Sequence, residues 1–132
     1  MFKGSCLCGA VQYEVDIDPQ PMGHCHCRTC RKAHSAAFST VMTVPASAFR
    51  WTKGEDQLGA FESSPGKIRQ FCGTCGSQLI AKRDDVVILR AGCIDTEIET
   101  RPAVHIWRSD GANWYDPKDA LPELPEGFPK PA

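Results

Sequence analysis

The spacing of the cysteines constrains this chain more than any other feature. Eight of its 132 residues are cysteine, and seven of these fall into three short groups. The densest group is Cys25-His26-Cys27-Arg28-Thr29-Cys30, which places three thiols within six residues. The other two groups are the pairs Cys6/Cys8 and Cys72/Cys75. We therefore expect the fold to be organised around these thiols.

The remaining composition describes an ordinary globular domain. Hydrophobic residues make up 42% of the chain and charged residues 23%, and the length lies in the range of one domain. A net charge of −1 offers no basic surface for nucleic acid or for an anionic membrane. We expect one domain over residues 1–132, with a core of about 4–116 and a proline-rich C-terminal tail at 117–132, and neither nucleic acid nor membrane as partner.

The N-terminus predicts the redox state of the thiols. Residues 1–6 contain no apolar stretch typical of a secretory signal, and no segment approaches the roughly 18 apolar residues that span a bilayer. We therefore expect a cytoplasmic protein, in which the environment keeps thiols reduced. Cysteines in such a compartment indicate metal binding or catalysis. The alternative is a disulfide scaffold.

The pattern of apolar residues predicts a mainly β fold with little helix. Residues 10–17 alternate between apolar and polar side chains, as a half-buried strand does. Short helical turns are expected at 28–35 and 45–49. Further strands are expected at 37–44, 58–62, 67–71, 78–81 and 86–91, with a last one around Val104 and Ile106.

The two cysteine pairs have the spacing of a closed zinc site. Structural zinc takes four tetrahedral ligands from two short knuckles. Cys72-Gly73-Thr74-Cys75-Gly76 is one such knuckle, and Cys6-Leu7-Cys8-Gly9 is a tighter version. Together Cys6, Cys8, Cys72 and Cys75 supply four thiolates. The alternative for Cys72 and Cys75 is a redox couple, but that motif opens a helix, and strands are expected on both sides here.

The triplet Cys25, Cys27 and Cys30 then remains with three thiolates. Catalytic zinc sites have three protein ligands and leave the fourth position for water or substrate. The alternative is a second closed site with a fourth ligand, for which Cys93 is the first candidate. If residues 86–93 form one strand, however, Cys93 shares the core-facing side of Leu89. If residues 30–34 are helical, His34 lies one turn from Cys30, where it lines a substrate pocket or is solvated.

These residues resemble the glutathione-dependent formaldehyde-activating family, also called the CENP-V/GFA domain. The resemblance covers about residues 4–127. Its motifs are Gly4-Ser5-Cys6-Leu7-Cys8-Gly9-Ala10-Val11, the triplet stretch 25–30, Phe71-Cys72-Gly73-Thr74-Cys75-Gly76-Ser77, Ala91-Gly92-Cys93-Ile94-Asp95, Arg101-Pro102, His105-Ile106-Trp107 and Trp114-Tyr115 before Leu121-Pro122.

The resemblance implies an Mss-four-like fold and two zinc sites, with full occupancy of the second left open. Cys6, Cys8, Cys72 and Cys75 would hold structural zinc, and Cys25, Cys27 and Cys30 would hold catalytic zinc. The implied activity is that of a carbon–sulfur lyase, the condensation of a thiol such as glutathione with an aldehyde such as formaldehyde. A zinc-stabilised binding module without catalysis is the alternative on the same fold. A third interpretation, a sulfoxide reductase with Cys93 as nucleophile, requires an activated thiol in an electropositive setting.

Overall fold

The N-terminal strands form a small antiparallel sheet. In the computed structural model, which describes residues 1–128, the three strands lie in the order β1 (Phe2–Ser5), β2 (Gln12–Val15) and β5 (Phe49–Lys53). The alternation expected for residues 10–17 is present, since Val11, Tyr13 and Val15 are buried and Asp16 is exposed. One face of the sheet therefore covers the core.

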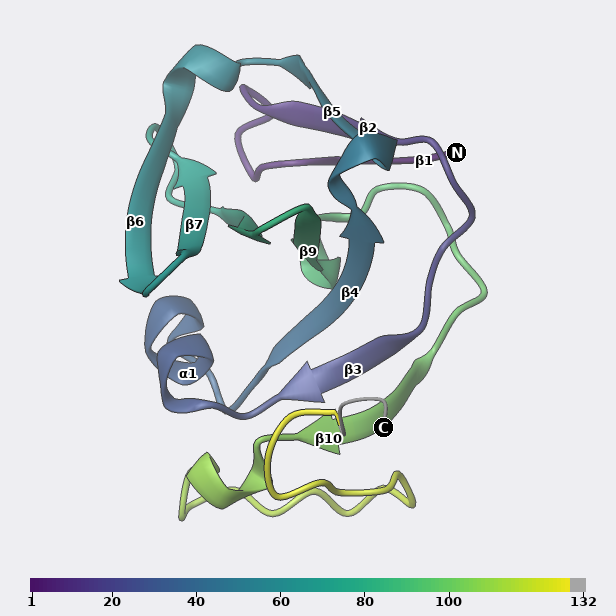
Figure 1. Cartoon of the computed structure of the whole chain (residues 1–132), viewed down its shortest axis with the longest axis vertical. Helices are drawn as coiled ribbons and strands as arrows, with labels where there is room; N and C mark the ends of the chain where they lie inside the picture. Colours follow the sequence, from purple (N-terminus) through teal and green to yellow (C-terminus); the bar gives the residue numbers. More distant parts are fainter. Residues whose placement is uncertain (129–132) are drawn as a thin grey trace.

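Seven strands form the larger sheet, in the order β10-β3-β4-β9-β8-β7-β6. Their bounds are β3 Met22–Cys25, β4 Ser39–Pro45, β6 Leu58–Ser64, β7 Lys67–Cys72, β8 Gln78–Arg83, β9 Val86–Arg90 and β10 Pro102–Ile106. Every pairing is antiparallel except that of β10 with β3. The sheet curves, so that β6 and β7 stand across the molecule from β3 and β10 (Figure 1).

Helix is scarce, as the sequence predicted. Within residues 1–128 the only α-helix is α1, Arg28–His34, and the other helical pieces are four 3-10 turns, at Ala46–Ala48, Glu55–Gln57, Ala91–Cys93 and Arg108–Asp110. The mainly β fold is thereby confirmed. None of these described helices is long and apolar enough to cross a membrane.

Two groups of buried side chains hold the strands together. The larger lies between the sheets and contains Phe2, Cys6, Val11, Tyr13, Val15, Met22, Met42, Val44, Cys72, Leu79, Ile80, Val87 and Leu89. The smaller contains Cys25, Cys30 and Ile106, with Trp107 and Leu124 packed against them. Members of both cysteine clusters are thus part of the apolar interior.

The chain after β9 departs from the predicted strand. The strand ends at Arg90, and residues 91–93 form a 3-10 turn closed by a hydrogen bond from Ile94 N to Ala91 O (3.0 Å). Gly92 has no side chain to pack in a strand, which favours the turn. The strand placement of Cys93 was therefore wrong, but Cys93 packs against the core that contains Leu89, as expected.

The C-terminal segment runs along β10. His105 N donates to Pro122 O (2.9 Å), Leu124 N donates to His105 O (2.8 Å), and Trp107 N donates to Glu126 O (2.9 Å). The segment therefore lies against the sheet beside β10 (Figure 1). Residues 129–132 of the predicted tail lie outside the described residues.

Candidate functional site

Two loops bring four thiols together at one end of the core. Cys6 and Cys8 follow β1, Cys72 ends β7, and Cys75 lies in the turn before β8. The four sulfurs lie within 4.8 Å of one another, with 3.6 Å between Cys6 and Cys8 and 3.8 Å between Cys8 and Cys72. Four sulfurs at the zinc–sulfur bond length define a tetrahedron with edges of about 3.8 Å. The group therefore fits zinc.

Glycines shape both loops of this four-thiol group. Gly9 and Gly76 directly follow the second cysteine of each pair and have φ values of 79° and 81°. These are left-handed conformations that favour glycine. Each glycine N–H donates to the carbonyl of the first cysteine of its pair, Cys6 (3.0 Å) or Cys72 (2.8 Å). The two knuckles are thus built alike, although one has a residue less between its cysteines.

The triplet lies at the junction of β3 and α1. Cys25 ends β3, Cys27 caps the N-terminus of α1, and Cys30 lies in its first turn. Cys30 N donates to Cys27 Sγ (3.3 Å). Interactions with the side chains of Cys25 and Cys30 hold the pKa of Cys27 well below its usual range. The three sulfurs lie within 4.8 Å of one another, and no other histidine, cysteine, aspartate or glutamate of residues 1–128 joins them.

Neither Cys93 nor His34 joins the three thiols of the triplet. Cys93 belongs to neither thiol group, and its sulfur donates to Gln78 O (3.4 Å). Burial raises the pKa of Cys93 to about 11, so its thiol is protonated at neutral pH. His34 ends α1, half-buried. Burial, with the positive charge of Arg90, lowers the pKa of His34 to about 4.

Two buried arginines face the triplet from the sheet. Arg69 on β7 and Arg90 on β9 are each 3% exposed. Arg69 Nη2 donates to Cys30 Sγ (3.8 Å) and to Thr29 Oγ1 (3.1 Å), and Arg90 Nη1 lies 4.0 Å from the same sulfur. No carboxylate among the described residues pairs with either guanidinium. Because a buried charge requires a counter-charge, the thiolates are the anions that these cations accompany.

Sequence reasoning did not identify these arginines. Arg90 ends the most apolar strand of the chain. A single charged residue in such a strand indicates a buried charge that requires a partner. Arg69 shares one side of β7 with Lys67 and Phe71, which is visible only once the strand is placed.

Two cavities border the triplet. The first, of about 260 Å³, is lined by Cys25 and Cys30 with Arg90. The second, of about 360 Å³, is lined by Cys27 among others. Lys67 and Trp107 line both. Burial lowers the pKa of the Lys67 ammonium group, which makes it a stronger acid. Each cysteine of the triplet thus lines one of the two cavities.

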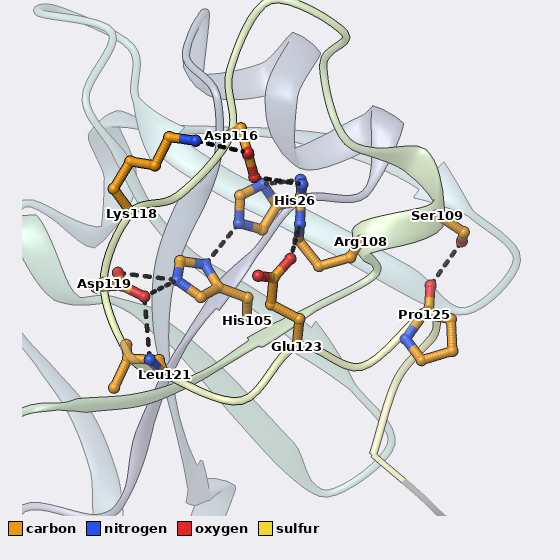
Figure 2. A network of polar contacts seen from close by, with 10 residues as sticks. All are labelled: His26, His105, Arg108, Ser109, Asp116, Lys118, Asp119, Leu121, Glu123 and Pro125. Atoms are coloured by element: carbon orange, nitrogen blue, oxygen red, sulfur yellow. Dashed lines mark hydrogen bonds and ion pairs between the residues drawn. The ribbon is translucent and has the colours of Figure 1, made fainter.

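A chain of hydrogen bonds supports the triplet from its opposite side. His26 lies between two of the cysteines but is fully buried, and its Nε2 is 2.8 Å from His105 Nδ1. His105 Nε2 is 3.0 Å from both carboxylate oxygens of Asp119. Arg108 is 3.5 Å from His26 Nδ1 and pairs with Glu123 at 2.7 Å. Figure 2 shows that this network joins the triplet segment to β10 and to the C-terminal segment.

Comparison with known proteins relates the chain to one enzyme family. The family model of the glutathione-dependent formaldehyde-activating enzyme matches residues 1–110. A protein of Halomonas elongata is 26% identical over 88% of this chain and 80% of its own length. One of Phaeosphaeria nodorum is 28% identical over 97% and 67% respectively. Both are provisionally named glutathione-dependent formaldehyde-activating enzymes.

Two further matches are a protein named as a lyase and a solved structure. A Schizosaccharomyces pombe protein, named an uncharacterized lyase, is 31% identical over 59% of this chain and 55% of its own length. A crystal structure of a Rhodobacter sphaeroides protein superposes with a TM-score of 0.64 at 21% identity, over 92% of this chain and 98% of the other. The structural match supports the fold alone.

Proposed function

Because the chain belongs to the glutathione-dependent formaldehyde-activating enzyme family, we propose that it catalyses the reversible addition of glutathione to formaldehyde to give S-(hydroxymethyl)glutathione. The observation that carries this proposal is the triplet of Cys25, Cys27 and Cys30. It offers three thiolates, has no fourth metal-ligating side chain within residues 1–128, and borders two cavities. The four-thiol group, in contrast, has its full set of ligands.

The proposed cofactor is zinc, held in the closed site by Cys6, Cys8, Cys72 and Cys75 and in the open site by the triplet. When bound by the triplet, zinc would favour the thiolate form of a thiol substrate or polarise a carbonyl oxygen. In the reaction the glutathione thiol releases its proton and its sulfur forms a bond to the aldehyde carbon. The carbonyl π electrons move to the oxygen, which then takes up a proton.

The residues around the triplet suit this chemistry. Arg69 and Arg90 contact the sulfur of Cys30, so their positive charges favour thiolate over thiol at the site. Lys67 lines both cavities, and its lowered pKa suits a group that donates the proton from Nζ to the alkoxide oxygen. Trp107, which lines both cavities, excludes water on the side of β10.

Exchange spectroscopy by NMR tests the proposal. We expect zinc-loaded protein, at a concentration far below that of the substrates, to accelerate exchange between free formaldehyde and S-(hydroxymethyl)glutathione. The Cys27→Ser variant should lose the acceleration and one zinc ion. Cys93→Ser is the matched control, because Cys93 belongs to neither thiol group, and it should keep both. No acceleration by the zinc-loaded protein would leave a binding module as the better interpretation, and loss of activity in Cys93→Ser would contradict the assignment of the site.

A further inference from the structure

A third cleft shares Thr29 of α1 with the cavity that Cys27 lines. It has a volume of about 350 Å³ and is bounded by Thr29, Lys32 and Ala33 of α1 on one side. Phe61, Ser63, Arg69, Phe71 and Gln78 of β6, β7 and β8 line the remainder. Figure 1 shows α1 beside the β6–β7 hairpin. The closed site and the triplet contribute no cysteine to this cleft.

Two buried polar atoms of this cleft have no hydrogen-bond partner among residues 1–128. One is Nη1 of Arg69, a residue that is 97% buried, and the other is Oε1 of Gln78. An unpaired donor on a buried charge is costly, by about 1–3 kcal/mol or more. The other guanidinium nitrogens of Arg69 already donate to Ser63, Thr29 and Cys30. The guanidinium is therefore fixed in place with one donor available.

The walls and charges of the cleft define what fits it. Phe61 and Phe71 provide apolar surface, and Phe61 is 65% exposed although it is a large aromatic residue. Lys32 adds a second positive charge, and no acidic residue lines the cleft. A carboxylate satisfies Arg69 with a charge-assisted hydrogen bond, and an adjacent N–H group satisfies Gln78. These are the groups at the end of a peptide.

We propose that this cleft binds the carboxylate end of a substrate, with the carboxylate on Arg69 Nη1. This inference rests on the function proposed above, in which the substrate is the thiol and the carboxylate is that of its glycine. The geometry is suitable because Arg69 lines the cleft and its Nη2 also lies 3.8 Å from Cys30 Sγ, so the cleft borders the triplet. The same guanidinium thus links the cleft to the triplet. A carboxylate on the aldehyde is the other source of the same chemistry.

Calorimetric binding to the zinc-loaded protein separates the two sources. One pair of probes is S-methylglutathione and its glycine amide, and the other is succinate semialdehyde and butanal. Within the pair that uses the cleft, the acid should bind about 10- to 100-fold more tightly than its neutral counterpart, because a hydrogen bond to a charged group is lost in the latter. S-Methylglutathione has no free thiol, and no thiol is added to the samples that contain an aldehyde. The affinities therefore do not depend on whether the protein catalyses the addition.

Variants locate the effect in the cleft. Arg69→Gln should remove the preference for the acid, whereas Lys82→Gln, which removes an exposed positive charge from neighbouring β8, should keep it. Phe61→Ala leaves the guanidinium unchanged, so it should reduce the binding affinity of the acid and of its neutral counterpart equally. Zinc content is measured for each variant, because Arg69 also contacts Cys30.

Three results would overturn the inference. They are equal affinity for acid and neutral probe in both pairs, an acid preference that survives Arg69→Gln, and unchanged affinities in Phe61→Ala. Should Arg69→Gln fail to fold, the comparison of acid with amide on the unaltered protein and the Phe61→Ala variant still decide the question.

Discussion

The two thiol groups are expected to differ in what their loss costs. Cys72→Ser removes a ligand from a group that joins β1 to the turn between β7 and β8, and Cys72 is fully buried in the main core. Cys27→Ser removes a ligand from a group confined to one short segment, and Cys27 is partly exposed. Both variants lose one thiolate and gain one hydroxyl. Any difference in stability between the two variants therefore reflects which segments each thiol group connects.

Loop-closure entropy gives the size of the difference. Cys8 and Cys72 lie 64 residues apart, and a cross-link over such a loop stabilises the folded chain by about 4 kcal/mol. The thiols of Cys27 and Cys30 lie three residues apart, for which the same relation gives about 2 kcal/mol. Small domains have total stabilities of about 5–15 kcal/mol. Cys72→Ser should therefore leave much of the protein unfolded, whereas Cys27→Ser should stay folded.

Urea unfolding followed by circular dichroism, with zinc measured by plasma mass spectrometry, checks this expectation. Cys27→Ser should unfold cooperatively and retain one zinc ion per chain. Cys72→Ser should show little or no cooperative transition. A Cys72→Ser protein as stable as Cys27→Ser would refute the assignment of the four-thiol group as the site that joins distant segments. Cys93→Ser, outside both groups, should match the unaltered protein.

Three further predictions concern polar groups that are buried or that contact a buried residue. The pKa of His34 in the folded protein is lowered from 6.5 to about 4, so the stability that its neutral ring contributes is present above pH 6.5 and is lost as the pH falls toward 4. The NMR signals of the ring should therefore stay constant down to pH about 5. A titration midpoint of these signals near pH 6.5 would contradict this prediction. Tyr13→Phe should raise the free energy of unfolding by about 1 kcal/mol, because the hydroxyl of Tyr13 is buried and has no partner among residues 1–128; a lower urea midpoint would show that the hydroxyl is satisfied. Asp119→Ala removes the carboxylate that faces His105, so limited proteolysis within residues 117–126 should accelerate while the zinc content stays the same; unchanged proteolysis would show that other contacts hold this segment.

The cysteine groups were predictable because metal ligation imposes spacing on the chain itself. Knuckles of two cysteines and a glycine are local patterns, so the expected four-thiol and three-thiol groups were visible before any strand was placed. The strands β6 and β7 were also predictable from a local pattern, since a turn with Gly66 separates two short strands. The identity of the bound metal and the roles of the cysteines in catalysis stay predictions.

Features that depend on distant segments were missed. Gly4 in β1 has no side chain, so it cannot contribute to an alternating pattern of apolar residues. Glycine is nevertheless required at this position, because the ring of Tyr13 lies 2.3 Å from where a β-carbon would be. Strand β3, which begins at Met22, contains a glycine and a histidine instead of an apolar series, and its pairing with β4 and β10 decides its conformation. Arg69 and Cys30 are 39 residues apart in the chain, so no local pattern reveals their contact.

The parallel pairing of β3 with β10 affects the order in which the two centres are completed during synthesis. All four thiols of the closed group have been made once Cys75 is added, and the three of the triplet have been made by Cys30. Strand β3, which ends at Cys25, can pair with β10 only after β10 has been synthesised. The cavity lined by Cys25 and Cys30 also includes Trp107 and Phe128 in its walls. Chains emerge from the ribosome in sequence order, and contacts between distant segments form slowly. A nascent chain therefore contains both thiol groups well before the segment that includes Phe128 can enclose the cavity beside Cys25 and Cys30.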